Sequence, residues 1–381
     1  MGRRQRLIST SILRAIFKAK TSSDPDKRPG LLARILAFFS VFSLALSRYR
    51  ADLFRHLRNK IWQIEEEEYT ESFRSPSKGK RTDLISVGDL GYSGSTFFTS
   101  PNSKYLIKSL PRAFEQSFFR QRLLDVYVEH MQLEPASLLV RITDLLYSPQ
   151  TTLGSFFGTT PDHHMVMENI LYGKSSCSKD DQDVWESYDL KPNDYFYPER
   201  DIADGRLAPE SVKERLIDVF EDKVRLTIDQ KEDLVAQITR DTKILQDNNA
   251  VDYSLFLVRY PASMSSADKG DVPVPPGRSA PWRSGLVSRD GRWVYRAILL
   301  DFFWSKDALQ AQAMTGLITS YNFLKWGRDH GPMSITTSSD EYRTRFLRMV
   351  EDMIEIPDSS GQPSGELRTP SQSTRNLIEE V

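Results

Sequence analysis

NNAVDYSLFL, residues 248–257, places one carboxylate, Asp252, among apolar residues that favour a β-strand. A second carboxylate, Asp301, follows the apolar run AILL and precedes two phenylalanines. A phosphoryl-transfer site needs two such acids. One accepts the proton of the attacking hydroxyl or orients it, and the other holds the magnesium ion that bridges the nucleotide phosphates.

The composition of the chain is that of a soluble folded protein. Its 381 residues suffice for two medium domains or one large two-lobed domain, and 39% of them are hydrophobic. The net charge of -1 argues against a generally basic nucleic-acid binder, so we expect no nucleic-acid partner. The single cysteine, Cys177, excludes an internal disulfide and fits a reducing, cytoplasmic location.

The positive charge is concentrated at the N-terminus. Residues 1–60 contain fourteen Lys and Arg against three Asp, a net charge of +11, whereas the remainder carries -12. Residues 31–47, LLARILAFFSVFSLALS, allow three interpretations: a helix packed on the domain, a helix at a membrane surface, or a span or targeting signal. We treat residues 1–48 as a basic and apolar N-terminal segment.

Periodicity predicts helices and strands in an ordered series from residue 49 onward. Helices are expected at 49–62, 112–133 and 208–250, and strands at 84–89, 95–100, 104–110, 137–148, 163–171, 251–258 and 297–301. Residues 261–291 are dense in Pro, Gly and Ser and predict a mobile insertion. The polar tail 357–381 predicts disorder.

A short glycine-serine segment and a strand lysine lie before the two acids. Residues 91–98, GYSGSTFF, connect two predicted strands, and their small side chains would let backbone N–H groups approach phosphate oxygens. Lys108 lies in the apolar strand YLIKSL, with Leu106 and Leu110 on the same face. It could therefore reach nucleotide phosphates, as the strand lysine of kinases does.

These segments, in this order, resemble the phosphatidylinositol phosphate kinase family over residues 49–356. The resemblance begins at YRADLFRHLRNKIWQIEEEEYTESF and continues through GYSGSTFF and YLIKSL. YDLKPN, residues 188–193, stands where the family has Asp-Leu-Lys-Gly-Ser. DTKILQDNNAVDYSLFL and ILLDFF resemble the catalytic segment and the metal-binding strand, and YRTRFLRMVEDMI resembles the closing helix.

The resemblance implies roles for individual residues. The ATP phosphates would be bound by Gly91, Ser93, Gly94, Ser95 and Lys108. Glu115, on the following helix, would pair with Lys108. Asp252 would act as catalytic base or orient the lipid hydroxyl, Lys191 would add positive charge near the transferred phosphoryl group, and Asp301 would coordinate Mg²⁺.

The chain departs from the family pattern at two places. Pro192 and Asn193 replace Gly-Ser in YDLKPN, and the proline ring fixes φ where a flexible residue is expected. The segment after Asp301 contains few lysines, although typical members carry a lysine cluster there that meets the anionic lipid headgroup. Headgroup specificity therefore cannot be transferred from the family.

The implied fold is two-lobed α+β, similar to lipid kinases. An N-terminal lobe, 49–172, and a C-terminal lobe, 173–356, would each contain an antiparallel sheet, with the nucleotide between them. The implied function is an ATP- and Mg²⁺-dependent kinase, peripheral on an anionic membrane surface, that phosphorylates an inositol hydroxyl of a phosphatidylinositol phosphate. The alternatives are a pseudokinase or phosphoinositide-binding scaffold with weak or no activity, and a soluble small-molecule kinase or ligase. A homodimer is left open.

Overall fold

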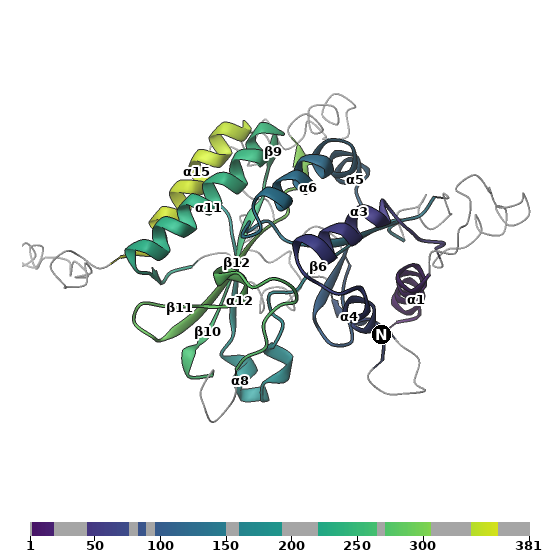
Figure 1. Cartoon of the computed structure of the whole chain (residues 1–381), viewed down its shortest axis with the longest axis horizontal. Helices are drawn as coiled ribbons and strands as arrows, with labels where there is room; N and C mark the ends of the chain where they lie inside the picture. The colour runs from purple at the N-terminus through teal and green to yellow at the C-terminus, as the bar shows by residue number, and fades with distance from the viewer. Residues whose placement is uncertain are drawn as a thin grey trace, which may run out of the picture.

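The computed structural model describes residues 2–18, 44–75, 83–88, 96–149, 160–192, 220–264, 271–305 and 337–356. They form an α+β structure that contains antiparallel sheets (Figure 1). Most of the predicted strands and helices are present in the expected order. The helix predicted over 208–250 is an exception: its described part is helical only over Ile228–Asp247, and Val224–Arg225 form a strand. The strand Glu186–Leu190 was not predicted.

The larger sheet has six strands in the order β1-β5-β6-β4-β3-β2, and all neighbours are antiparallel. Its strands are β1 (Ser47–Arg48), β2 (Ile85–Gly88), β3 (Phe97–Thr99), β4 (Tyr105–Ser109), β5 (Ile142–Tyr147) and β6 (His163–Glu168). Strand β4, which carries Lys108, lies inside this sheet between β3 and β6. Because β4 is hydrogen-bonded to a strand on each side, the backbone at Lys108 is held in place within the sheet.

Helices pack on this sheet through their apolar faces. Near the N-terminus these are α1 (Arg3–Phe17), α3 (Ala51–His56), the π-turn η1 (Leu57–Ile61) and α4 (Glu66–Glu71). The predicted helix 112–133 is continuous in space but changes pitch, and it contains α5 (Ala113–Phe118), the π-turn η2 (Phe119–Leu123) and α6 (Leu124–Leu133). The two π-turns each insert one residue into a helical turn, which shifts the buried face that follows them.

The second sheet has four strands in the order β11-β12-β10-β7. They are β7 (Glu186–Leu190), β10 (Ser254–Pro261), β11 (Leu286–Val287) and β12 (Trp293–Leu300). Two short ribbons accompany them, formed by β9 (Ala250–Val251) with β13 (Trp304–Ser305) and by β8 (Val224–Arg225) with β14 (Ile354–Glu355). The remaining short helices are η3 (Lys174–Ser176), α8 (Lys179–Asp183), η5 (Ala262–Met264) and α12 (Pro281–Ser284).

Two long helices, α11 (Ile228–Asp247) and α15 (Ser339–Asp352), lie side by side (Figure 1). The side chain of Thr227 caps the N-terminus of α11, and Gln230 completes a capping box. These two residues determine where the helix begins. Arg343 of α15 donates to the Thr242 hydroxyl at 3.1 Å and to the Thr239 carbonyl at 3.0 Å. These bonds fix the two helices relative to each other.

Backbone hydrogen bonds join the two sheets directly. The N–H of Val140, just before β5, donates to the carbonyl of Leu299 in β12 at 3.0 Å. The N–H of Leu299 donates to the carbonyl of Leu138 at 2.7 Å. The strand that ends next to Asp301 is therefore bonded to the chain that enters the larger sheet.

A buried arginine strengthens the same connection. Arg283 of α12 pairs with Glu168 at the end of β6 at 3.0 Å, and each residue is 2% exposed. Arg283 also donates to the carbonyls of Ser137 and Leu139, at 2.6 and 2.5 Å. The prediction of a mobile insertion over 261–291 does not anticipate these contacts, because Pro and Gly content gives no information about a single arginine that reaches buried acceptors.

The apolar stretch 31–47 lies mostly outside the described residues. At its end, Leu44 and Leu46 are buried in the core, at 5% and 6% exposed. Among the described residues no helix is both long enough and apolar enough to cross a membrane. The predicted tail, 357–381, also lies outside the described residues.

Stability is expected to fall by about 3 kcal/mol as the pH drops from neutral to 4, because of His164 in β6. Burial, and secondly the neighbouring His163, lowers the pKa of His164 from 6.5 to about 4. As the pH falls, His164 is protonated near pH 6.5 in the unfolded chain but only near pH 4 in the folded chain. The free energy of unfolding therefore decreases as the pH falls between these two values. Urea unfolding of His164→Gln across this range measures the effect. The dependence of the unfolding free energy on pH should be weaker in His164→Gln than in the wild type. It should be unchanged in His56→Gln, which replaces an exposed histidine.

Candidate active site

Strand pairing brings three chemically important segments to one end of the four-stranded sheet. Ser254 at the start of β10 pairs with Leu300 at the end of β12, and Leu255 pairs with Leu190 at the end of β7. Asp252 therefore precedes one strand at the same edge where Asp301 follows its neighbour. Lys191 follows the third strand at this edge.

The ribbon β9–β13 fixes the two acids from the other side. Val251 pairs with Trp304, so the residues just before Asp252 lie against those just after Asp301. Both acids adopt positive φ, 65° at Asp252 and 60° at Asp301. Aspartate tolerates this left-handed conformation better than most residues, but it still costs free energy that the surrounding pairing must supply. Such strained positions cluster at functional sites.

Two ion pairs connect the predicted site residues. Lys108 of β4 bonds the carboxylate of Asp301, which joins the larger sheet to the smaller one across the site. Lys191 Nζ lies 3.0 Å from Asp252 Oδ2. Burial tends to raise the pKa of Asp301, but the positive charges of Lys108 and Lys191 outweigh burial and hold this pKa below its usual value. Asp301 is therefore ionised at neutral pH.

Glu115 lies near this group but does not pair with Lys108 in the way the sequence predicts. It accepts a hydrogen bond from Arg112 at 3.1 Å, whereas Lys108 bonds Asp301. Burial raises the pKa of Glu115, and the charges of Lys108 and Arg112 only partly oppose that shift. The charge of Lys108 thus acts on Glu115, but the direct partner of Glu115 is Arg112, the residue that precedes its helix.

The predicted phosphate-binding residues Gly91, Ser93, Gly94 and Ser95 lie outside the described residues. The strands on either side, β2 and β3, are described and pair with each other. Phe97 of β3 lies opposite Lys108 in the register. The described end of β3 therefore lies beside Lys108.

Asp189 is a third acid at the site, and the sequence analysis did not select it. It lies on β7, two residues before Lys191, which follows the end of that strand, so extended backbone would place the two side chains on one face. Its Oδ1 is buried and has no hydrogen-bond partner among the described residues. Burial raises the pKa of Asp189, and repulsion from Asp301 adds to the shift against the attraction of Lys191. The motif YDLKPN contained this residue, but only the strand register shows that it faces the site.

Aromatic side chains hold the segment that carries Asp301. Phe302 and Phe303 are 0% and 4% exposed. The ring centroid of Phe302 lies 6.1 Å from that of Tyr127, and the ring centroid of Phe303 lies 5.3 Å from that of Phe119. Trp304 contacts Phe114 at 4.6 Å. The helix 113–133 therefore positions Asp301 through its neighbours. In the sequence these aromatic residues appear as an apolar run after Asp301, and periodicity alone does not show which helix they contact.

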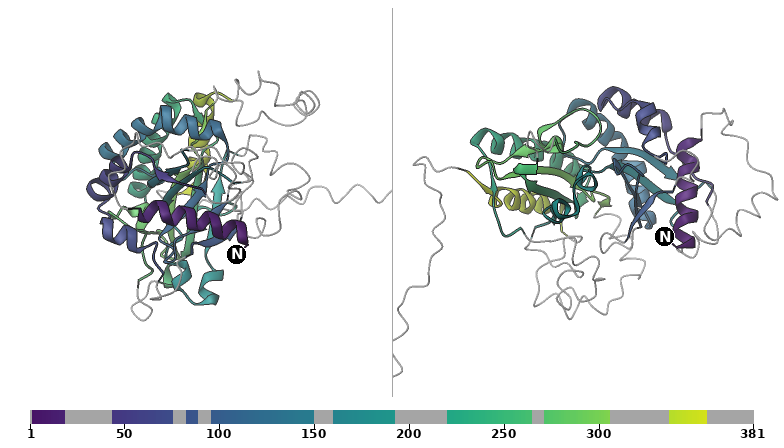
Figure 2. Two further views of the ribbon diagram at one scale, coloured as in Figure 1. Left: turned by 90° about the vertical axis from the view of Figure 1, so that its right-hand side faces the viewer. Right: turned by 90° about the horizontal axis from the view of Figure 1, so that it is seen from below.

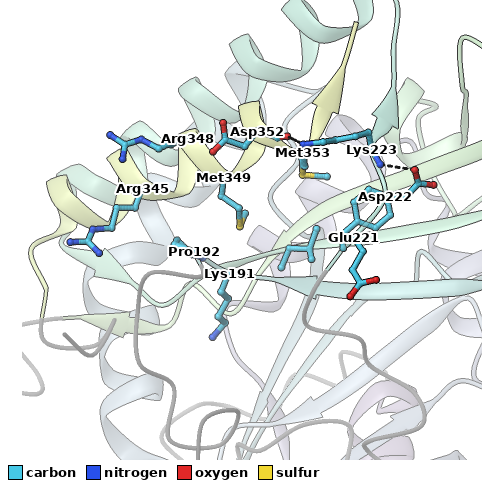
Figure 3. A pocket seen from close by; sticks show the side chains of 12 residues that line it. Lys191, Pro192, Glu221, Asp222, Lys223, Arg345, Arg348, Met349, Asp352 and Met353 are labelled. Atoms are coloured by element: carbon cyan, nitrogen blue, oxygen red, sulfur yellow. Dashed lines mark hydrogen bonds between the residues drawn. The ribbon is translucent and has the colours of Figure 1, made fainter. Parts of the chain in front are cut away.

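A pocket of about 230 Å³ lies behind Lys191 (Figure 3). Its wall is formed by the end of β7, by residues 220–223 and by α15, and it includes Leu190, Lys191, Pro192, Phe220, Arg345, Met349 and Met353. In Figure 3 the Lys191 side chain points away from Met349 and α15. The pocket therefore adjoins the base of Lys191 but not its ammonium group.

The donors at the site fit a divalent cation that is shared with a phosphorylated ligand. No group of three or more His, Cys, Asp or Glu side chains suited to a metal occurs within the described ranges. Mg²⁺ does not need such a group, because it commonly takes one or two carboxylates and completes its shell with phosphates and water. Asp301 is ionised and half-buried. The unpartnered Oδ1 of Asp189 belongs to β7, which is separated by β10 from β12, the strand that Asp301 follows.

Asp189→Asn is expected to stabilise the folded protein at neutral pH. Burial and the nearby Asp301 disfavour the ionised carboxylate of Asp189 and raise its pKa. The free energy of unfolding of the wild type therefore decreases as the pH rises through the pKa of Asp189 in the folded protein. Thermal unfolding at acidic and alkaline pH measures this. The gain should appear only at the higher pH, and equal melting temperatures of wild type and variant at alkaline pH would contradict the assigned repulsion.

Comparison with known proteins agrees with this geometry. A sequence model of the family described as "Phosphatidylinositol-4-phosphate 5-Kinase" matches residues 78–275, which include Lys108, Asp189, Lys191 and Asp252. Asp301 lies beyond the matched range, and its place in the site rests on the strand register.

Two relatives carry related names. A probable phosphatidylinositol phosphate kinase of Dictyostelium discoideum is 28% identical over 216 residues, which are 56% of this chain and 27% of the relative. A phosphatidylinositol 4-phosphate 5-kinase of Plasmodium falciparum is 28% identical over 218 residues, 55% of this chain and 12% of the relative. The chain thus spans only about a quarter and an eighth of these proteins. Because the family match covers more than half of its residues, the chain belongs to the phosphatidylinositol-4-phosphate 5-kinase family.

Proposed function

We propose that this protein transfers a phosphoryl group from ATP to an inositol hydroxyl of a phosphatidylinositol phosphate. The observation that carries the proposal is the pair of contacts Lys108–Asp301 and Lys191–Asp252, which gather two acids and two lysines at one edge of the sheet. Phosphoryl transfer needs little covalent chemistry from the protein, and such a group of charges supplies its positioning and electrostatic stabilisation.

The nucleotide would lie between two lobes built on the six-stranded and four-stranded sheets. Lys108 would bind its phosphates, helped by the backbone of Gly91, Ser93, Gly94 and Ser95. Phe256 lies directly opposite Asp189 in the register, so it shares the face that carries the reactive groups, and it is only half-buried. This apolar surface, continued by the half-buried Leu300, suits the base of a nucleotide.

A magnesium ion, when bound with the nucleotide, would neutralise the charge that develops on the phosphates. Asp301 would hold it, and Lys108 would then turn from Asp301 toward the phosphates. Asp252 would accept the proton of the inositol hydroxyl or orient that hydroxyl. Lys191, whose Nζ lies 3.0 Å from Asp252 Oδ2, would place a positive charge beside the transferred group.

A second function, a phosphoinositide-binding protein with weak or no turnover, is favoured by Pro192. This residue follows Lys191 at a position where relatives of the expected pattern carry glycine, and it removes a backbone N–H donor. Lys191 nevertheless reaches Asp252 with Pro192 in place. The geometry therefore supports the kinase more strongly than the scaffold.

Phosphate transfer from labelled ATP to vesicles tests the proposal. Vesicles that each contain one phosphatidylinositol monophosphate should show label in the lipid, with a requirement for Mg²⁺ that EDTA removes. Free inositol phosphates serve as the comparison, because a soluble small-molecule kinase would prefer them. Binding to phosphoinositide vesicles without any transfer on any lipid would favour the scaffold function instead.

A further inference from the structure

The backbone of Tyr253, the residue after Asp252, faces β7 rather than β12. Leu299 of β12 makes its backbone hydrogen bonds with the segment before β5, on the side away from β10. Residues of an antiparallel strand bond alternately to the neighbours on either side, so Leu300 bonds to its partner Ser254 in β10. The same alternation, carried one residue back from Ser254, turns the carbonyl of Tyr253 toward β7.

The residue of the chain opposite that carbonyl lacks a backbone donor. Leu255 of β10 pairs with Leu190 of β7, and this register, carried two residues further, places Pro192 opposite Tyr253. Proline has no N–H to donate. A buried carbonyl without a donor destabilises the folded state, so the carbonyl of Tyr253 needs a donor from another element.

Tyr342 of α15 supplies that donor. Its hydroxyl donates to the Tyr253 carbonyl at 2.5 Å, and both residues are 0% exposed. The ring centroid of Tyr253 also lies 4.7 Å from that of Tyr342 and 4.9 Å from that of Phe346. The two tyrosines are therefore joined by one directed bond and by ring packing.

Helix α15 is a fixed support for this hydroxyl. Arg343, the next residue, donates to the Thr242 hydroxyl and the Thr239 carbonyl of α11. Figure 2 shows α15 in yellow beside the green elements of the smaller sheet, at the end of the molecule away from α1. Because α11 leads through β9 to Asp252, the segment that carries this acid is supported by both helices.

We propose that Tyr342 is a positioning residue for Asp252. Its hydroxyl gives the Tyr253 carbonyl the hydrogen bond that Pro192 cannot give, and so holds Asp252 at its φ of 65° with the carboxylate beside Lys191. A strained backbone of this kind persists only where its surroundings hold it. The inference rests on the proposed function, which gives Asp252 its role at the lipid hydroxyl.

The test measures transfer from ATP to a monomeric, short-chain phosphoinositide at varied ATP concentration. Tyr342→Phe keeps the ring and removes only the hydroxyl. It should lower kcat about tenfold, because a small misplacement of a reacting group is costly, and leave the KM for ATP unchanged. Tyr69→Phe is the matched control, since its buried hydroxyl donates to Asp144 of the larger sheet at 3.1 Å. It should lose stability and keep kcat.

Pro192→Gly provides a second background, because glycine restores a backbone N–H opposite the Tyr253 carbonyl. In that background Tyr342→Phe should lower kcat only about twofold, since the carbonyl keeps one donor. Urea unfolding of the wild type, the two single variants and the double variant gives a readout apart from turnover. The loss of stability from Tyr342→Phe should be smaller with glycine than with proline.

Three outcomes would overturn the proposal: unchanged kcat in Tyr342→Phe, a fall in kcat of the same size in Tyr69→Phe, or equal losses in the proline and glycine backgrounds. A wild type that transfers no phosphate to any lipid would instead overturn the kinase proposal. The unfolding measurements would then still decide whether Tyr342 takes the place of the donor that Pro192 lacks.

Discussion

Replacing Asp301 with asparagine is expected to lower phosphoryl transfer by a thousandfold or more. A metal ion stabilises the transition-state charge by several kcal/mol, and each 1.4 kcal/mol is about a factor of ten in rate. Asparagine keeps the size and tolerates the φ of 60°, whereas alanine would add backbone strain at the same position. Initial rates on phosphoinositide vesicles at saturating ATP measure the loss.

The matched control is Asp229→Asn, since Asp229 is exposed in the first turn of α11, at the end of that helix opposite to the one that leads to Asp252. It should keep full activity. Binding of Mn²⁺ in the presence of ADP provides a readout apart from turnover, and it should weaken only in Asp301→Asn. Full transfer by Asp301→Asn, with unchanged cation affinity, would remove Asp301 from the metal role and leave it as a partner of Lys108.

Arg283→Met is expected to destabilise the protein by about 3–5 kcal/mol, the range for breaking a buried ion pair by removal of one partner. The change leaves the buried carboxylate of Glu168 without its cation and two carbonyls, of Ser137 and Leu139, without their donor. Arg283→Lys should recover only part of the loss, because an ammonium cannot reproduce the fork of the guanidinium. Urea unfolding of each variant gives the free energies.

Arg292→Met, at an exposed position before β12, is the control and should change stability by less than about 0.5 kcal/mol. The double variant Glu168→Gln with Arg283→Met separates charge from packing, since it removes the unpaired carboxylate. It should be more stable than Arg283→Met alone. Equal stability of Arg283→Met and wild type would show that the two sheets are held together without this pair.

The sequence predicted the order of strands and helices and most of the reactive group. The helix at 112–133 and the strands of YLIKSL and VDYSLFL follow from local periodicity and occur as expected. Lys108, Lys191, Asp252 and Asp301 were selected from short motifs, and the structure brings them into two ion pairs. The predicted pairing of Lys108 with Glu115 is replaced by the bond to Asp301. A helix register carries no information about which of two nearby acids a lysine prefers.

By itself, the sequence determined which segments form strands and helices, that Asp252 and Asp301 lie at strand ends, and that the N-terminus is basic. These properties depend on neighbours along the chain. Only the tertiary structure decided that Asp189 faces the site and that Arg283 joins the two sheets. Each of these depends on contacts between residues far apart in sequence, whose free energy is set by burial and by partners that local pattern does not specify.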